Sequence, residues 1–173
     1  MNHIIQINAK DISNAKEFSE SVVNETYNRF SKDLFTRKER IFFGKLGEII
    51  FLNFLNSKNI FPDTTGMFEI YLGETNVDKF DFFTKDKQKI DVKSAYKDYH
   101  KRILVPYDQF EGGRAKDYYV GVKISLETRH AEVCGFTTKV KLLQNGKKDF
   151  GEGPAYWEYL NNLDDINILV DKI

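Results

Sequence analysis

The fold of this 173-residue chain is decided by two short stretches, Phe80-Asp81-Phe82 and Ile90-Asp91-Val92-Lys93-Ser94. Both alternate apolar and charged side chains, which is the two-residue period of a half-buried β-strand. The polar tetrapeptide Lys85-Asp86-Lys87-Gln88 lies between them and predicts the turn of a hairpin. We therefore expect two antiparallel strands that bring Asp81 beside Asp91.

The chemistry of the second strand follows from the same alternation. Ile90 and Val92 point into the core, so Asp91 and Lys93 stand side by side on the opposite face. Two carboxylates that are held close together repel each other unless a cation lies between them. Hard oxygen ligands of this kind suit Mg²⁺ or Mn²⁺. A surface hairpin that carries ordinary charges is the alternative interpretation, because an Asp-x-Lys triplet is common by chance.

A third carboxylate lies on the apolar stripe of the strongest predicted helix, which runs from about residue 37 to 57. Glu48 recurs with apolar residues at steps of three and four, so the helix turns it toward the body of the protein. Buried carboxylates are rare unless they are paired, protonated or bound to metal. Gly44 and Gly47 precede Glu48, and a helix tolerates such glycines where a backbone or a ligand approaches closely. The alternative is a tight packing contact, with Glu48 reaching a neighbouring lysine.

The rest of the chain completes one α/β domain, in which two leading helices pack on a mainly antiparallel or mixed sheet. No linker or repeat divides it. We predict strands over residues 3–8, 67–72, 79–84, 89–95, 118–124, 131–136 and 166–170. We also predict a helix over residues 14–34, capped by Asp11 or Ser13. A short helix that runs through residue 143 should be capped by Thr137 or Thr138.

The charge of the chain is zero overall but unevenly distributed. Residues 85–148 hold fifteen basic and eight acidic side chains, for a net charge of +7. Residues 1–84 carry −2 and residues 149–173 carry −5. A positive middle segment predicts a phosphate-facing surface that the total conceals. A solvated face followed by an acidic segment is the alternative interpretation.

Taken together, Glu48 on a helix, then Asp81, then Asp91-Val92-Lys93, resemble the PD-(D/E)XK nuclease superfamily. The likeness spans about residues 38–137 and leaves residues 149–173 as an acidic C-terminal extension. It implies a restriction-endonuclease-like core, which is a mixed central β-sheet flanked by helices. The sequence departs from the family's name at Phe80, where that name has proline.

The resemblance implies a Mg²⁺-dependent endonuclease that acts on DNA, with Mn²⁺ able to replace Mg²⁺. Asp81 and Asp91 would ligate the metal together with the backbone carbonyl of Val92. Glu48 would ligate a second metal or hold a metal-bound water, and Lys93 would orient the attacking water. We further expect DNA contacts from the basic side chains Lys45, Lys97, Lys101, Arg102, Arg114 and Lys116.

A restriction or defence-system nuclease, or a subunit of one, is the expected setting, and a double-strand cut favours a homodimer or a second protein subunit. The alternatives are a structure-selective repair or junction nuclease and a non-catalytic nucleic-acid-binding module of the same fold. The sequence has no phosphate-binding loop for a nucleotide cofactor. The single cysteine and the absence of a signal peptide or a long apolar run predict a cytoplasmic protein without a membrane partner.

Overall fold

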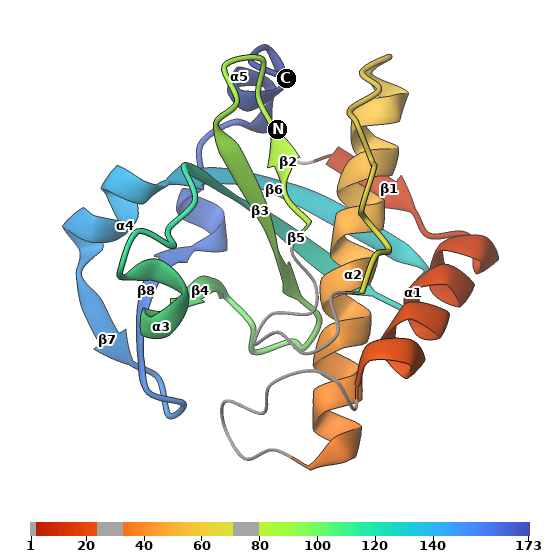
Figure 1. Ribbon diagram of the computed structural model, residues 1–173, viewed down its shortest axis with the longest axis horizontal. Helices are drawn as coiled ribbons and strands as arrows, with labels where there is room; N and C mark the ends of the chain where they lie inside the picture. The colour runs from red at the N-terminus through yellow and green to blue at the C-terminus, as the bar shows by residue number, and fades with distance from the viewer. Residues whose placement is uncertain (1–2, 24–32, 71–79) are drawn as a thin grey trace.

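The computed structural model describes residues 3–23, 33–70 and 80–173 of the chain (Figure 1). It is a mixed α/β structure with two β-sheets. Its elements, in chain order, are β1 (His3–Gln6), α1 (Ala9–Val22), α2 (Leu34–Ser57), β2 (Phe82–Phe83), β3 (Lys89–Ala95), β4 (Arg102–Pro106), α3 (Tyr107–Phe110), β5 (Tyr118–Ser125), β6 (His130–Thr138), α4 (Lys139–Asn145), β7 (Lys147–Asp149), β8 (Pro154–Tyr159), the 3₁₀-helix η1 (Leu160–Asn162) and α5 (Ile166–Val170). None of the helices in these ranges is both long and apolar enough to span a bilayer.

The main sheet has five strands in the order β1-β6-β5-β3-β2. Its strands pair antiparallel except for β3 and β5, which run parallel. Parallel neighbours need a crossover connection, and here the crossover consists of β4 and α3. The predicted strands over 89–95, 118–124 and 131–136 are confirmed as β3, β5 and β6. The predicted mixed character of the sheet is confirmed as well.

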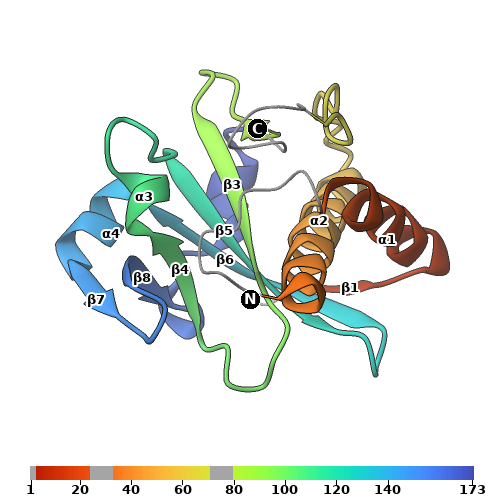
Figure 2. The same ribbon diagram turned by 60° about the horizontal axis from the view of Figure 1, so that its bottom comes forward.

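A smaller sheet, in the order β4-β8-β7, covers one face of the main sheet. Figure 2 shows it on one side of β3 and β5, with α1 and α2 on the other. Buried side chains from both sheets and from the nearby helices join in one cluster, made of Ile103, Val105, Phe110, Tyr119, Leu142 and Tyr156. The two sheets therefore form one packed unit.

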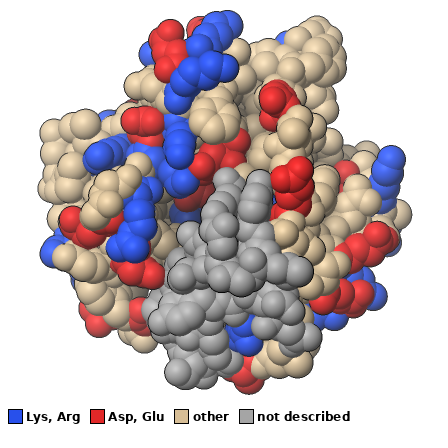
Figure 3. Space-filling view, in the orientation of Figure 1, with Lys and Arg blue, Asp and Glu red and all other residues tan. Residues whose placement is uncertain are grey.

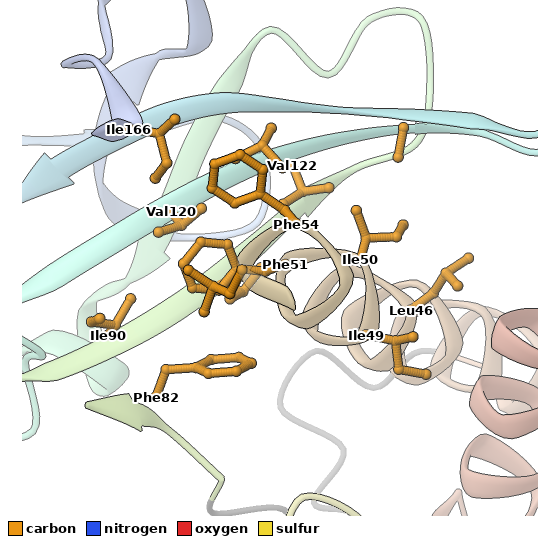
Figure 4. Packing of buried hydrophobic residues seen from close by; sticks show 14 of the residues in the cluster. Leu46, Ile49, Ile50, Phe51, Phe54, Phe82, Ile90, Val120, Val122 and Ile166 are labelled. Carbon is orange, nitrogen blue, oxygen red and sulfur yellow. The ribbon is translucent and has the colours of Figure 1, made fainter. Parts of the chain in front are cut away.

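Helix α2 covers the opposite face of the main sheet and forms the largest part of the core. Figure 4 shows its apolar side chains against those of β2, β3 and β5, among them Leu46, Ile50, Phe51, Phe54, Phe82, Ile90, Val120 and Val122. The helix approaches β3 most closely at Gly47, where a Cβ atom would lie 2.1 Å from Ser94 Oγ. A Cβ atom at this position would overlap the Ser94 side chain, so the serine or the helix would have to shift.

The first helix begins earlier than the sequence predicted. Asn8 is its N-cap: Asn8 Oδ1 accepts a hydrogen bond from the backbone N–H of Asp11 at 2.9 Å, and the Asp11 carboxylate accepts one from the Asn8 N–H at 3.1 Å. This capping box makes Asp11 the third helical residue, so the prediction that Asp11 or Ser13 caps the helix is wrong. The helix ends at Val22, and residues 24–32 lie outside the described ranges; Asp33 then caps a new helix, α2, so the predicted end of the first helix at residue 34 is wrong.

Two of the predicted strands are wrong in their described parts. Residues 67–70 lie in turns, in which the Met67 N–H donates to the Thr64 carbonyl and the Glu69 N–H donates to the Gly66 carbonyl. Residues 71 and 72 are outside the described ranges. Residues 166–170 form helix α5 instead of a strand, with Ile166 and Leu169 buried at helical spacing.

The segment after residue 149 is not an appendage to a core that ends near residue 137. Strand β8 pairs with the whole of β4, from Arg102 opposite Tyr159 to Pro106 opposite Ala155. Helix α5 adds Ile166 and Leu169 to the main core. This segment therefore contributes to both layers of the structure.

Candidate active site

The hairpin of β2 and β3 sets the relative position of the two aspartates. Phe82 pairs with Ile90 and Phe83 with Lys89, so Asp81 lies opposite Asp91 just beyond the last β2 pair. The turn is closed by the Thr84 N–H, which donates to the Gln88 carbonyl at 3.0 Å. Both aspartates are thereby held on one edge of the main sheet.

Asp81 is a buried carboxylate, with only 9% of the residue exposed. Its Oδ2 atom lies 2.7 Å from Lys116 Nζ in an ion pair. Burial raises the pKa of Asp81, and the nearby charge of Asp91 adds to the increase, while Lys116 acts in the opposite direction.

Asp91 and Lys93 point to the same face of β3, as the alternation predicts. Lys93 Nζ lies 2.8 Å from Asp91 Oδ2 and also donates to Gln109 Oε1 at 3.1 Å. Gln109 belongs to α3, the helix within the crossover between β3 and β5. The crossover therefore fixes the ammonium group of Lys93 from the side opposite α2.

Gln109 and Tyr119 complete the group of side chains around Asp81, Asp91 and Lys93, and neither was predicted from the sequence. Tyr119 lies opposite Asp91 in the β3–β5 register. Its hydroxyl accepts a hydrogen bond from the backbone N–H of Lys116 at 2.9 Å and so anchors the residue that pairs with Asp81. Burial raises the Tyr119 pKa, with smaller contributions from Asp91 and Asp81, so its hydroxyl stays protonated. Only the parallel register, which local sequence does not reveal, brings Tyr119 to this site.

Glu48 is in a different environment from the aspartates. Its Oε2 atom lies 2.7 Å from Lys45 Nζ, three residues earlier on α2. Lys45 also donates to the Met67 carbonyl at 2.6 Å and lies over the ring of Phe18 on α1. Both features of the alternative interpretation of Glu48 are therefore present: the close packing at Gly47 and the pairing of Glu48 with a lysine.

The residues at the hairpin fit a divalent metal in kind, but they form an incomplete set. Two carboxylates from adjacent strands supply the hard oxygen atoms that Mg²⁺ prefers, and burial raises the pKa of Asp81, one of the two. In the ranges that the structure describes, no three side chains of His, Cys, Asp or Glu are grouped closely enough to hold a metal ion. Glu48 is thus not grouped with Asp81 and Asp91 among the described residues, and its role at a second metal or a metal-bound water stays a prediction.

The basic residues predicted to contact DNA occupy very different positions. Lys45 is 1% exposed, so the prediction that it contacts DNA is wrong. Lys97 pairs with Glu39 at 3.3 Å, and Lys116 pairs with Asp81. Lys101 and Arg114 are exposed, whereas Arg102 lies among aromatic rings of the small sheet.

The charged side chains around the hairpin are visible on the surface. Figure 3 shows Lys and Arg atoms close to Asp and Glu atoms over β3 and α3. The ion pairs of Asp81 with Lys116 and of Asp91 with Lys93 place both signs of charge at the hairpin. The surface at the hairpin is therefore balanced in charge, although the segment from 85 to 148 is strongly basic.

Comparisons of the chain with models of protein families, with curated proteins and with solved structures found no match.

Proposed function

We propose that this protein is a metal-dependent nuclease that hydrolyses phosphodiester bonds in DNA, with a core similar to that of the PD-(D/E)XK superfamily. One observation carries the proposal: the hairpin register places Asp81 opposite Asp91, with Lys93 on the same face of the sheet. The two carboxylates offer oxygen ligands for a divalent metal, and Lys93 places a positive charge beside them.

The order of the elements supports the same proposal. A long helix, α2, precedes the hairpin, and β3 is joined to its parallel neighbour β5 by a crossover. Helix α2 packs against β3 at Gly47, one residue before Glu48. A mixed sheet with a helix packed on it is consistent with the mixed central sheet flanked by helices that the resemblance implied.

In this proposal the two aspartates hold Mg²⁺ or Mn²⁺ with the carbonyl of Val92. A bound metal would polarise the phosphodiester and lower the pKa of its own water. Lys116 pairs with Asp81, so a metal held there would compete with this ion pair, and the Lys116 ammonium group would be close enough to offset the charge of a phosphate. Lys93, which Gln109 and Asp91 position, orients the attacking water.

The test is cleavage of supercoiled plasmid, linear duplex and single-stranded DNA, with Mg²⁺ or with EDTA. Asp91→Asn and Lys93→Ala should each reduce metal-dependent cleavage by about tenfold or more, which is a barrier increase of about 1.4 kcal/mol. The controls are Asp86→Asn in the exposed hairpin turn and Lys16→Ala on the exposed side of α1. Wild-type cleavage by the Asp91 or Lys93 variant, or EDTA-resistant cleavage, would place the chemistry elsewhere.

A second candidate is a non-catalytic DNA-binding module of this fold. The observation in its favour is that Asp81, Asp91 and Glu48 each have a lysine within 2.8 Å. Such pairs can stabilise a fold without any metal. DNA binding by a preparation that cleaves none of the three DNA forms in Mg²⁺ or Mn²⁺ would select this candidate over the nuclease.

A further inference from the structure

The small sheet has one face that does not pack against the main sheet. Along β4, Ile103 and Val105 are buried, whereas Leu104 between them is 40% exposed. The register places Arg102 opposite Tyr159 and Leu104 opposite Trp157, and opposite residues of antiparallel strands share a face. We call this surface the outer face; with the neighbouring residues of β7 and the following turn it comprises Arg102, Leu104, Lys148, Phe150, Trp157 and Tyr159.

Three aromatic rings are clustered on the outer face. The ring of Trp157 lies 5.2 Å from that of Tyr159 and 5.8 Å from that of Phe150, with interplanar angles of 88° and 75°. These are edge-to-face contacts, which hold rings in place without stacking them. Trp157 is half-buried, and among the described rings none is stacked parallel on it.

Cations accompany these rings. The guanidinium of Arg102 lies 4.7 Å from the ring centre of Tyr159 and 4.9 Å from that of Phe150, and it donates to the Tyr159 hydroxyl. Its Nε atom is buried and has no hydrogen-bond partner among the described residues. Lys148 lies over the ring of Phe150, 5.4 Å from its centre.

The acidic groups closest in sequence are engaged elsewhere. Asp149 accepts hydrogen bonds from the backbone N–H groups of Gly151 and Gly153, and Glu152 pairs with Arg40 of α2. Glu158 has the opposite parity to Trp157 and Tyr159 and is buried, where Asn145 donates to it. The outer face is therefore aromatic and positive, as far as the described chain shows.

We propose that the outer face binds single-stranded DNA, with unpaired bases stacking on Trp157 and its neighbouring rings and phosphates contacting Arg102 and Lys148. Aromatic platforms lined by cations bind single strands in this way, because every base has a π-face and every linkage carries a negative charge. In a duplex the bases are stacked on each other, so they cannot reach such a platform.

This inference rests on the proposed function, since it names the form of DNA that the nuclease would act on. Strand β4 connects the two sites. It is the edge strand of the small sheet, and α3 follows it directly and carries Gln109 to Lys93. A DNA segment with an unpaired strand can thus lie on the outer face while its continuation passes the edge at β4 toward Lys93.

Trp157 itself provides the first test, because it is the only tryptophan in the chain. Its fluorescence is titrated in EDTA, so that no cleavage occurs, with an oligothymidylate of about 15 nucleotides, a length that covers a typical single-strand site. We expect quenching, and at least about tenfold tighter binding than to a duplex of the same length. Unchanged fluorescence, equal binding of the duplex, or tighter binding of the matching oligouridylate would overturn the proposal.

Variants give the second test. Trp157→Ala should weaken binding of the labelled oligothymidylate by about tenfold, the loss expected from one stacked base, whereas Trp157→Phe should keep most of the affinity. Phe61→Ala, at an aromatic position that is 75% exposed after α2, is the matched control and should change nothing. If Trp157→Ala does not fold, the exposed Lys148→Ala variant, which should bind more weakly and with a smaller salt dependence, replaces it. Wild-type binding by the folded variants of the outer face would overturn the proposal.

The outcomes separate this inference from the proposed function. Quenching by the single strand without any metal-dependent cleavage would keep the outer face as a binding site and exclude the nuclease. Cleavage without quenching would keep the nuclease and exclude the outer face.

Discussion

Two ion pairs lie on opposite sides of the main sheet, and they differ in which partner is the more deeply buried. In the pair formed by Lys45 and Glu48, the lysine side chain is 0% exposed and the carboxylate 15%. In the pair formed by Lys116 and Asp81, the carboxylate is 8% exposed and the lysine 28%. Both have an N–O distance of 2.7 Å, so distance alone would rank them as equals.

The difference lies in what each buried partner can do when the other is lost. A buried carboxylate can take up a proton within a few pH units of neutrality, whereas a buried ammonium group remains charged until its pKa has fallen very far. On the α2 side, the buried Lys45 therefore depends on its ion pair with Glu48. At the hairpin, Asp81 can give up its ion pair with Lys116, because the buried carboxylate tolerates a change of charge.

The largest effect is expected for Glu48→Gln, which leaves Lys45 buried without its carboxylate. Breaking such a pair should lower the free energy of unfolding by about 3 kcal/mol, which urea denaturation measures directly. The double variant Lys45→Met/Glu48→Gln removes the buried charge as well and should recover most of the loss. A single variant as stable as wild type would show that Lys45 does not depend on Glu48.

The packing of α2 on β3 is the next most sensitive feature. Gly47→Ala should lower the free energy of unfolding by about 1–3 kcal/mol, since its Cβ would overlap Ser94 Oγ. Combining it with Ser94→Ala should relieve most of the overlap. The matched control is Gly44→Ala on the same helix, where a Cβ meets nothing within 4 Å and helix propensity predicts a gain of up to about 1 kcal/mol. Equal effects at the two glycines would contradict the close approach.

On the other side of the sheet, Lys116→Met should act through pH. Lys116 holds down a pKa of Asp81 that burial raises, so removing the ammonium group raises that pKa further. Stability linked to a carboxyl with a raised pKa is present below its unfolded value of about 3.9 and is lost as pH rises through the folded value. Urea denaturation should show a deficit against wild type of about 1 kcal/mol at neutral pH that shrinks in acid. A deficit that is independent of pH would contradict this account.

The smallest change in stability is expected for Asp81→Asn. The amide cannot ionise, so the decrease of stability with rising pH that Asp81 contributes should disappear. At neutral pH the free energy of unfolding should stay within about 0.5 kcal/mol of wild type, because Lys116 is partly solvated without its partner. Asp86→Asn in the exposed turn should keep the wild-type pH dependence.

Local patterns were sufficient to predict the elements that carry the hairpin. The alternation around Ile90 and Val92 and the polar turn gave the position of Asp81 opposite Asp91, because the period of a strand and the length of a turn are short-range properties. The same holds for Thr138, which caps α4 as one of the two predicted caps. Residues 166–170 were misassigned because a short apolar run fits a strand and a buried helix equally well.

The composition of the candidate site depended on tertiary structure. Gln109 and Tyr119 reach Lys93 and Asp91 only through the crossover and the parallel register, neither of which leaves a local signal. Lys45 was predicted to be a surface cation because lysines usually are; its burial depends on α1 and on the chain near Met67. The helical stripe correctly turned Glu48 inward, but it could not show that the more deeply buried charge is the lysine three residues earlier.

The long reach of the β4–β8 pairing sets an order in time for a chain that is made from its N-terminus. Arg102 of β4 pairs with Tyr159 of β8, and β4 is followed directly by α3, which contacts Lys93. Strand β4 therefore has no partner strand until more than fifty further residues have left the ribosome. At typical synthesis rates of about 5–20 residues per second, that interval lasts several seconds. During it, β4 is an unpaired edge that exposes apolar side chains. A nascent chain thus passes through a stage in which α2 can already fold against β3, while the part of the molecule that confines Lys93 is still incomplete. At this stage chaperones would bind the exposed side chains of β4.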